Sequence, residues 1–213
     1  MRDATKTLQN AGGLGLINNL LKSVFQSHSA FDRFGIALLH APFDAESSTG
    51  QVEPDPNLPT DPYVHFGNSA LPVHFSKLAS DAQTSIVPTC WGFGGPGTIL
   101  PVEYTFSSDP ASDQLTSSDL ALFADIQSAL AKSSISGIIG VSLLTHAIPG
   151  ISFKSDAVIT TLPFQAVSLM PANERYDDLW VFKNGDDATV NHVASGGRFE
   201  TSIQPDGCII VYW

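Results

Sequence analysis

The chain has 213 residues, of which 43% are apolar and 15% are charged, and its 21 acidic and 10 basic side chains give a net charge of −11. This length fits one domain, residues 1–213, and the low charged fraction excludes an intrinsically disordered chain. Clustered Lys and Arg bind nucleic acids and anionic membranes, and no three basic residues cluster here, so neither is an expected partner.

The N-terminal residues predict neither a signal peptide nor an ordered element. The opening sequence MRDATKTLQN lacks the apolar run of a signal peptide, and residues 1–12 are expected to fray. No apolar stretch reaches the roughly 18 residues that a membrane-spanning helix needs. We therefore expect a cytoplasmic protein in which Cys90 and Cys208 are both reduced thiols.

Two ordered elements are predicted before a proline-rich segment. A helix is expected after three closely spaced glycines, because apolar residues recur with helical spacing at Leu16, Ile17, Leu20, Leu21, Val24 and Phe25. Residues 34–40 (FGIALLH) are almost wholly apolar, which is typical of a strand buried on both faces. Residues 41–62 then hold five prolines and predict an irregular proline-rich loop or lid.

A glycine-rich segment separates two predicted strands, residues 84–91 and 99–106. Residues 92–97 match the G-x-G-x-x-G spacing of dinucleotide-binding turns. Such a turn opens a helix, whereas here β-forming residues follow, and Pro96 removes one of the backbone amides. We therefore interpret the segment as a turn between strands and not as a nucleotide site.

A second helix is predicted over residues 119–132. Thr116 and Asp119 have the spacing of a capping box, which marks its start. The residues expected to share its buried face are Leu120, Phe123, Gln127 and Leu130. A continuous apolar run over residues 138–145 then predicts another buried strand.

The remainder of the chain reads as short β segments. Asn184-Gly185 and Asp206-Gly207 are strong hairpin signals. Two main helices with about eight to ten strands favour the α+β class, with a mixed, mainly antiparallel sheet. Regular strand–helix–strand alternation is missing, which argues against a doubly wound sheet.

The six histidines are the most informative polar residues, and none of them forms the HExxH spacing of a zinc site. We single out His40, which ends a predicted buried strand where side chains of a site often emerge from a sheet. Asp44 follows it closely and could orient its ring. A lone histidine is more often a hydrogen-bonded structural residue, and that alternative stays open.

Glu103 is the second residue of interest. Strict alternation along its strand places it on one face with Ile99, Pro101 and Thr105, which is a mostly apolar set. A carboxyl group in such surroundings is expected to have a raised pKa, or to ligate a divalent metal together with His40 and His74. A solvent-facing charge on an edge strand is the alternative.

The segment RFGIALLH-x-x-FD, residues 33–44, resembles a segment in a group of uncharacterised fungal proteins. Those proteins carry a similar apolar strand ending in Leu-Leu-His, followed by a second histidine and Phe-Asp. Trp91 and the Pro-x-Glu at residues 101–103 also resemble that group. The resemblance implies a fungal source and brings no established activity.

This chain departs from the group at Pro42, where the second histidine is expected. If that histidine ligates a metal in the relatives, this protein has lost a ligand or uses His65 or His74 instead.

Two functional hypotheses follow. In the first, the protein is a small-molecule enzyme of fungal metabolism in which His40 is a general base or metal ligand, Glu103 is its partner, and residues 41–62 act as a lid. In the second, it is a non-enzymatic binding or interaction protein whose β-rich C-terminal part, with Tyr212 and Trp213, supplies a ligand or glycan surface.

Overall fold

The computed structural model describes residues 2–39, 49–53, 68–74, 86–94, 97–107, 109–147, 150–155, 158–162, 175–183, 185–198, 200–203 and 209–212. Its helices are α1 (Arg2–Asn10), α2 (Gly13–Ser27) and α4 (Ser117–Leu130). Its strands are β1 (Phe34–Leu38), β2 (Thr49–Glu53), β3 (Asn68–His74), β4 (Ile86–Phe93), β5 (Ile99–Phe106), β6 (Ile139–Leu143), β7 (Gly150–Ser155), β8 (Val158–Leu162), β9 (Arg175–Val181), β10 (Thr189–Arg198), β11 (Glu200–Ile203) and β12 (Ile209–Tyr212).

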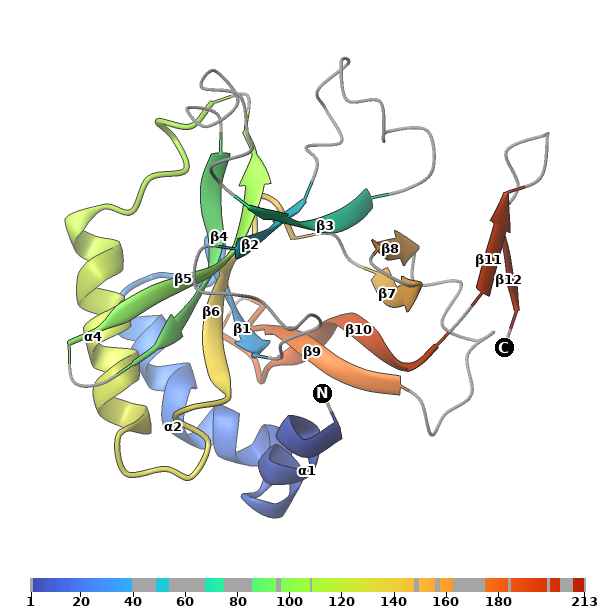
Figure 1. Ribbon diagram of the computed structural model, residues 1–213. Helices are drawn as coiled ribbons and strands as arrows, with labels where there is room; N and C mark the ends of the chain where they lie inside the picture. Colours follow the sequence, from blue (N-terminus) through green and yellow to red (C-terminus); the bar gives the residue numbers. More distant parts are fainter. Residues whose placement is uncertain are drawn as a thin grey trace.

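Ten of these strands form a closed barrel (Figure 1). Their order around it is β1-β6-β4-β5-β2-β3-β8-β7-β10-β9, and β9 pairs back with β1. The pairs β2–β5 and β7–β10 are parallel, and the other paired neighbours are antiparallel. The remaining strands, β11 and β12, form a separate two-stranded antiparallel sheet. The α+β class and the mixed, mainly antiparallel sheet are thus confirmed.

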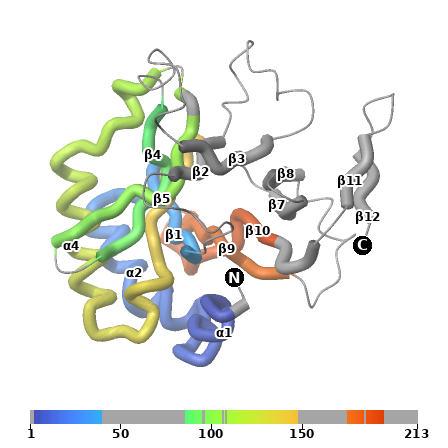
Figure 2. Tube along the Cα trace, in the orientation of Figure 1, coloured from blue at the N-terminus to red at the C-terminus, as the bar shows by residue number. Residues whose placement is uncertain are grey.

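The helices cover one side of the barrel, as both traces show (Figures 1 and 2). The shared apolar core takes Ile17, Leu21 and Phe25 from α2, Leu122, Phe123 and Ile126 from α4, and Phe34, Ile36, Trp91, Val141 and Trp180 from the strands. At its centre, the ring of Phe123 lies 5.2 Å from that of Phe34 and 5.4 Å from that of Trp91. Burial of such aromatic side chains is the main force that holds the helices on the barrel wall.

Both predicted buried strands are present. All residues of β1 are buried, and so are all but one residue of β6. One face of β1 contributes Phe34, Ile36 and Leu38 to the core under the helices. The opposite face, with Ala37, therefore looks into the barrel. Because neither face meets solvent, the sequence of β1 shows a continuous apolar run instead of alternation.

The N-terminal residues do not fray as predicted. Residues 2–10 form α1, and Leu8 is buried in the core with only 4% exposure. Gly12 and Gly13 follow with φ values of +118° and +59°. Left-handed backbone of this kind is easily adopted only by glycine, so these two residues allow the chain to turn between α1 and α2. The two main helices of the sequence prediction, α2 and α4, are confirmed.

The predicted loop over residues 41–62 is wrong in its middle. Residues 49–53 form β2, which pairs in parallel with β5 and in antiparallel fashion with β3. The prolines at positions 42, 54, 56, 59 and 62 all lie outside this strand. The prolines on both sides of this strand led to the prediction of a loop over the whole segment. The strand itself is stabilised by pairing with strands that are distant in sequence. The flanking residues 41–48 and 54–62 lie outside the described part of the chain.

The turn signals in the sequence are confirmed by strand pairing. The glycine-rich segment joins β4 and β5, which pair in antiparallel fashion, so it is a turn between strands as predicted. The strands flanking Asn184-Gly185 pair as β9–β10, and those flanking Asp206-Gly207 pair as β11–β12. Gly185 has a φ of +79°, a conformation that suits glycine in a turn.

Candidate functional site

Of the residues predicted from the sequence to form a site, Glu103 is the one whose side chain the structure describes. His40 and Asp44 lie outside the described residues. His74 is the last residue of β3, which is described by its backbone pairing alone. The grouping of His40 with Glu103, and the metal set that adds His74, therefore stay predictions.

Glu103 faces the interior of the barrel because a bulge interrupts β5. Pro101 pairs with Trp91, which packs under the helices, whereas Glu103 pairs with Cys90, which belongs to a different cluster of buried residues. Partners in an antiparallel pair share a face, so Pro101 points outward and Glu103 inward. The extra residue between them is Val102. The predicted face was therefore wrong for Pro101, whereas the regular pairing of β5 with β2 keeps Glu103 on the face of Thr105.

A second bulge turns His192 into the same space. On β10, Val190 pairs with Trp180 under the helices, whereas His192 pairs with Leu179. Leu179 clusters with Ala37 and Cys90 on the inner face of the barrel wall. Regular alternation would have placed Val190 and His192 on one face, and the extra residue Asn191 separates them.

His192 is held by a buried carboxyl group. Its Nδ1 lies 2.6 Å from Oδ1 of Asp178, and the side chains of His192 and Asp178 are 15% and 9% exposed. Asp178 is itself the extra residue of a bulge in β9. A carboxylate acceptor at Nδ1 favours the tautomer that carries its proton there. Nε2 is then the ring nitrogen that exchanges a proton with other groups.

The charges of this pair act on Glu103. The pKa of Glu103 is raised to about 7, first by burial and then by the neighbouring carboxylate of Asp178, while His192 acts to lower it. The pKa of Asp177 is also raised, first by burial and then by Asp178. A carboxyl group with a pKa near neutrality can both accept and donate protons at physiological pH. Glu103 thus lies close enough to the His192–Asp178 pair for their charges to affect its pKa, and we refer to these three residues of β5, β9 and β10 as the acid–base group.

Small residues line part of the barrel interior beside this group. A Cβ atom on Gly140 would lie 2.5 Å from Cδ2 of Leu39, and one on Gly92 would lie 2.9 Å from Cδ1 of the same residue. Both glycines therefore make room for the Leu39 side chain, which packs against the cluster of Ala37, Cys90 and Leu179. Cys90 is a buried thiol within this layer, with 1% exposure.

Two further histidines pair with aspartates outside this group. His28, the C-cap residue of α2, contacts Asp125 on α4 at 2.7 Å. Nε2 of His146 lies 2.8 Å from Asp113, and Ser107 donates to the same carboxyl oxygen at 2.6 Å. A catalytic triad needs the serine bonded to the imidazole, so these three residues do not form one. Both pairs connect segments that are distant in sequence, which is a structural role.

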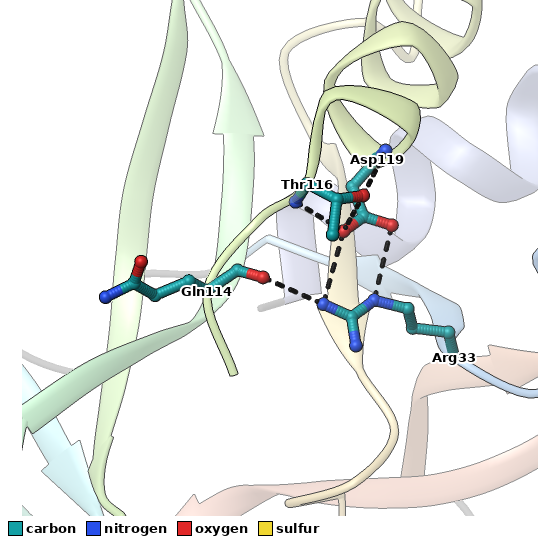
Figure 3. A network of polar contacts seen from close by, with 4 residues as sticks. All are labelled: Arg33, Gln114, Thr116 and Asp119. Atoms are coloured by element: carbon teal, nitrogen blue, oxygen red, sulfur yellow. Dashed lines mark hydrogen bonds and ion pairs between the residues drawn. The ribbon is translucent and has the colours of Figure 1, made fainter. Parts of the chain in front are cut away.

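A network of polar contacts connects the N-terminus of α4 to the start of β1 (Figure 3). Asp119 and Thr116 form the predicted capping box, in which each side chain accepts a hydrogen bond from the other's backbone amide. Arg33 donates from Nε to Asp119 at 3.2 Å and from Nη2 to the carbonyl of Gln114 at 3.0 Å. These contacts hold α4 against the barrel and engage the carboxylate of Asp119 as a hydrogen-bond acceptor.

Within the described part of the chain, no three His, Cys, Asp or Glu side chains are grouped closely enough to hold a metal ion. The helices that the structure describes include none long and apolar enough to cross a membrane. No family model, curated protein or solved structure matches this chain.

Sequence reasoning did not select Asp178 or His192, although a signal for both was present. Asn184-Gly185 predicts a hairpin, and residues at equal distances from its turn lie opposite each other. That rule brings His192 close to Asp177 and Asp178. No local sequence pattern indicates that Glu103 lies near this pair, because β5 and β10 are not neighbours in the barrel.

Proposed function

We propose that this protein is a small-molecule enzyme that uses acid–base chemistry inside the barrel. Glu103 and His192 exchange protons with the substrate, and Asp178 orients the imidazole. The observation that carries this proposal is an inward-facing carboxyl group with a pKa of about 7 that is shifted by the charges of a largely buried His–Asp pair. Groups with such perturbed pKa values are most useful for proton transfer near neutral pH.

The arrangement suits removal of a proton at one position of a substrate and its return at another. His192 accepts a proton at Nε2, and the Asp178 carboxylate stabilises the resulting imidazolium. Protonated Glu103 donates a proton to the developing negative charge. Because Asp178 adds negative charge beside them, the reacting part of the substrate is expected to be neutral or positively charged.

The test is a turnover screen of purified wild-type protein at pH 7. Small carbonyl compounds are followed in D₂O by ¹H NMR, where exchange of the hydrogen next to the carbonyl reports proton abstraction, and small esters are followed for hydrolysis. We expect Glu103→Gln and His192→Asn to slow any observed reaction by about 100-fold or more.

His28→Asn is the matched control, because it removes a histidine that also pairs with an aspartate but lies at the C-terminal cap of α2. This variant should keep the wild-type rate. Absence of turnover by wild-type protein, or rates in Glu103→Gln and His192→Asn equal to wild type, would contradict the proposal.

His40 and Asp44 belong to a further part of this proposal. His40 comes two positions after the buried strand β1, and side chains of a site often emerge at the end of such a strand, which supports a role for His40 as a general base or metal ligand. Metal analysis of the wild-type protein and of the His40→Ala and Glu103→Ala variants tests that role. Equal metal content and equal ligand binding in all three proteins would remove it.

A binding protein without catalysis is the second candidate. It is supported by a pocket of about 380 Å³ at one end of the barrel, lined by both apolar and polar side chains, which lies in the size range of small-molecule sites. Ligand binding by wild-type protein without turnover of any compound in the screen would favour this candidate.

A further inference from the structure

The pocket at the end of the barrel is lined by apolar side chains and by two side chains of opposite charge. It lies where β1 begins and where β6 and β9 end, and its apolar lining is provided by Phe31, Leu144, Ala147, Val181 and Phe182. Its polar lining consists of Asp32, Lys183 and Asn191. A volume of about 380 Å³ has room for a single small organic molecule.

The apolar wall is rigid. The rings of Phe31 and Phe182 lie 6.1 Å apart in an edge-on arrangement, and Phe182 also packs against Phe25 at 5.1 Å. Val181 and Phe182 are 4% and 1% exposed, so they are fixed by the surrounding protein. Such a preformed aromatic surface suits an aromatic or branched aliphatic group.

The two charged residues are not neutralised by each other. Asp32 precedes β1 and Lys183 follows β9, two strands that pair. Among the described residues, neither Asp32 nor Lys183 takes part in an ion pair. A ligand with one charge would meet attraction from one of these side chains and repulsion from the other. A ligand with both charges is attracted by each.

Asn191 adds a neutral polar group to this site. It is the extra residue of the bulge in β10, and it lines the pocket. Its side-chain amide carries both a donor and an acceptor, so it can bond to either charged group of a ligand. The same bulge that separates Val190 from His192 thus supplies a polar contact to the pocket.

We propose that this pocket binds a small zwitterion with an apolar side group, of the class of the apolar amino acids. The carboxylate of the ligand faces Lys183, its ammonium group faces Asp32, and its side group lies against the partly exposed Phe31, Leu144 and Ala147. The lining of this site includes none of the three residues of the acid–base group, Glu103, Asp178 and His192. This inference does not depend on the proposed chemistry.

The test compares three probes that share a phenyl group: L-phenylalanine, 3-phenylpropionate and 2-phenylethylamine. Their binding to full-length protein at pH 7.5 is measured by saturation-transfer NMR and calorimetry. We expect L-phenylalanine to bind at least about threefold more tightly than either singly charged probe, because it gains one more charge contact.

Two variants separate the two charges. Lys183→Met should weaken L-phenylalanine and 3-phenylpropionate but not 2-phenylethylamine, and Asp32→Asn should weaken L-phenylalanine and 2-phenylethylamine but not 3-phenylpropionate. Lys132→Met, at an exposed position just after α4, is the matched control and should leave all three affinities unchanged.

Binding of L-phenylalanine should also be unchanged in Glu103→Gln, so the result for the pocket is independent of the proposed catalysis. The inference is overturned if none of the three probes binds at millimolar concentration. It is equally overturned if a singly charged probe binds as tightly as L-phenylalanine, or if the two variants weaken all probes alike.

Discussion

Glu103 and His192 show how one extra residue in a strand decides the surroundings of a titratable side chain. Without the bulge at Val102, Glu103 would share the face of Pro101, and without the bulge at Asn191, His192 would share the face of Val190. The face of Pro101 is exposed, whereas the face of Val190 packs against the apolar core under the helices. On that second face, burial of an ionisable group without a partner would cost several kcal/mol. The bulges bring them instead into a common interior.

The raised pKa of Glu103 predicts a specific dependence of stability on pH. Its pKa rises from about 4.5 in the unfolded chain to about 7 in the folded protein. The folded state therefore binds more protons than the unfolded state between these values, and its stability falls as the pH rises through that window. The contribution is fully present below pH 4.5 and is lost above pH 7.

Glu103→Gln mimics the protonated carboxyl group and should remove this dependence. We expect the free energy of unfolding of the variant to gain up to about 3 kcal/mol relative to wild type between pH 4.5 and pH 7. Urea unfolding of both proteins at several pH values measures the difference. Parallel stability curves would show that Glu103 is not buried as described.

At the scale of the elements, α4 is a helix whose buried face differs from the one expected. Leu120 was grouped with Phe123 and Leu130, yet it is 47% exposed, and the buried face is formed by Asp119, Leu122, Phe123, Ile126 and Leu130. The capping box accounts for part of this difference. Asp119 turns inward to bond Thr116 and Arg33, and Leu120, the next residue, is thereby turned towards solvent.

This orientation of α4 predicts unequal effects of two substitutions. Phe123→Ala removes a ring that contacts Phe34, Trp91 and Phe93, and it should lower the free energy of unfolding by about 3–5 kcal/mol. Leu120→Ala on the same helix should change it by less than about 0.5 kcal/mol. Thermal and urea unfolding measure both. Similar losses in the two variants would contradict the placement of α4.

At the scale of the whole molecule, the pairing of β9 with β1 closes the barrel and removes its open edges. The helices pack on the outer face of the strands next to this closure. On this side of the molecule, the barrel wall is therefore covered by a layer of helices. Such a region is expected to open only when the entire domain unfolds.

Hydrogen exchange tests this arrangement. Amides of β1 and β6 should exchange most slowly, with a free energy of opening equal to that of global unfolding. Amides of the separate β11–β12 sheet should exchange faster, because a two-stranded sheet has little stability of its own. Protection of β11 and β12 equal to that of β1 would contradict this distribution of stability.

The sequence by itself determined the features that depend on local patterns: the α+β class, the helices α2 and α4, the capping box at Thr116, the buried strands β1 and β6, and the hairpins around the glycine turns. Spacing of apolar residues and turn chemistry act over a few residues, so they can be recognised without the fold. They also drew attention to Glu103.

Only the tertiary structure decided the closure of the barrel, the strand β2 among its prolines, and the group formed by Glu103, Asp178 and His192. Each of these depends on contacts between segments far apart in the chain. Bulges in two strand pairs change which face a side chain occupies, and no local sequence pattern marks their positions. The direction of a side chain that follows a bulge is therefore set by strand pairing and not by alternation.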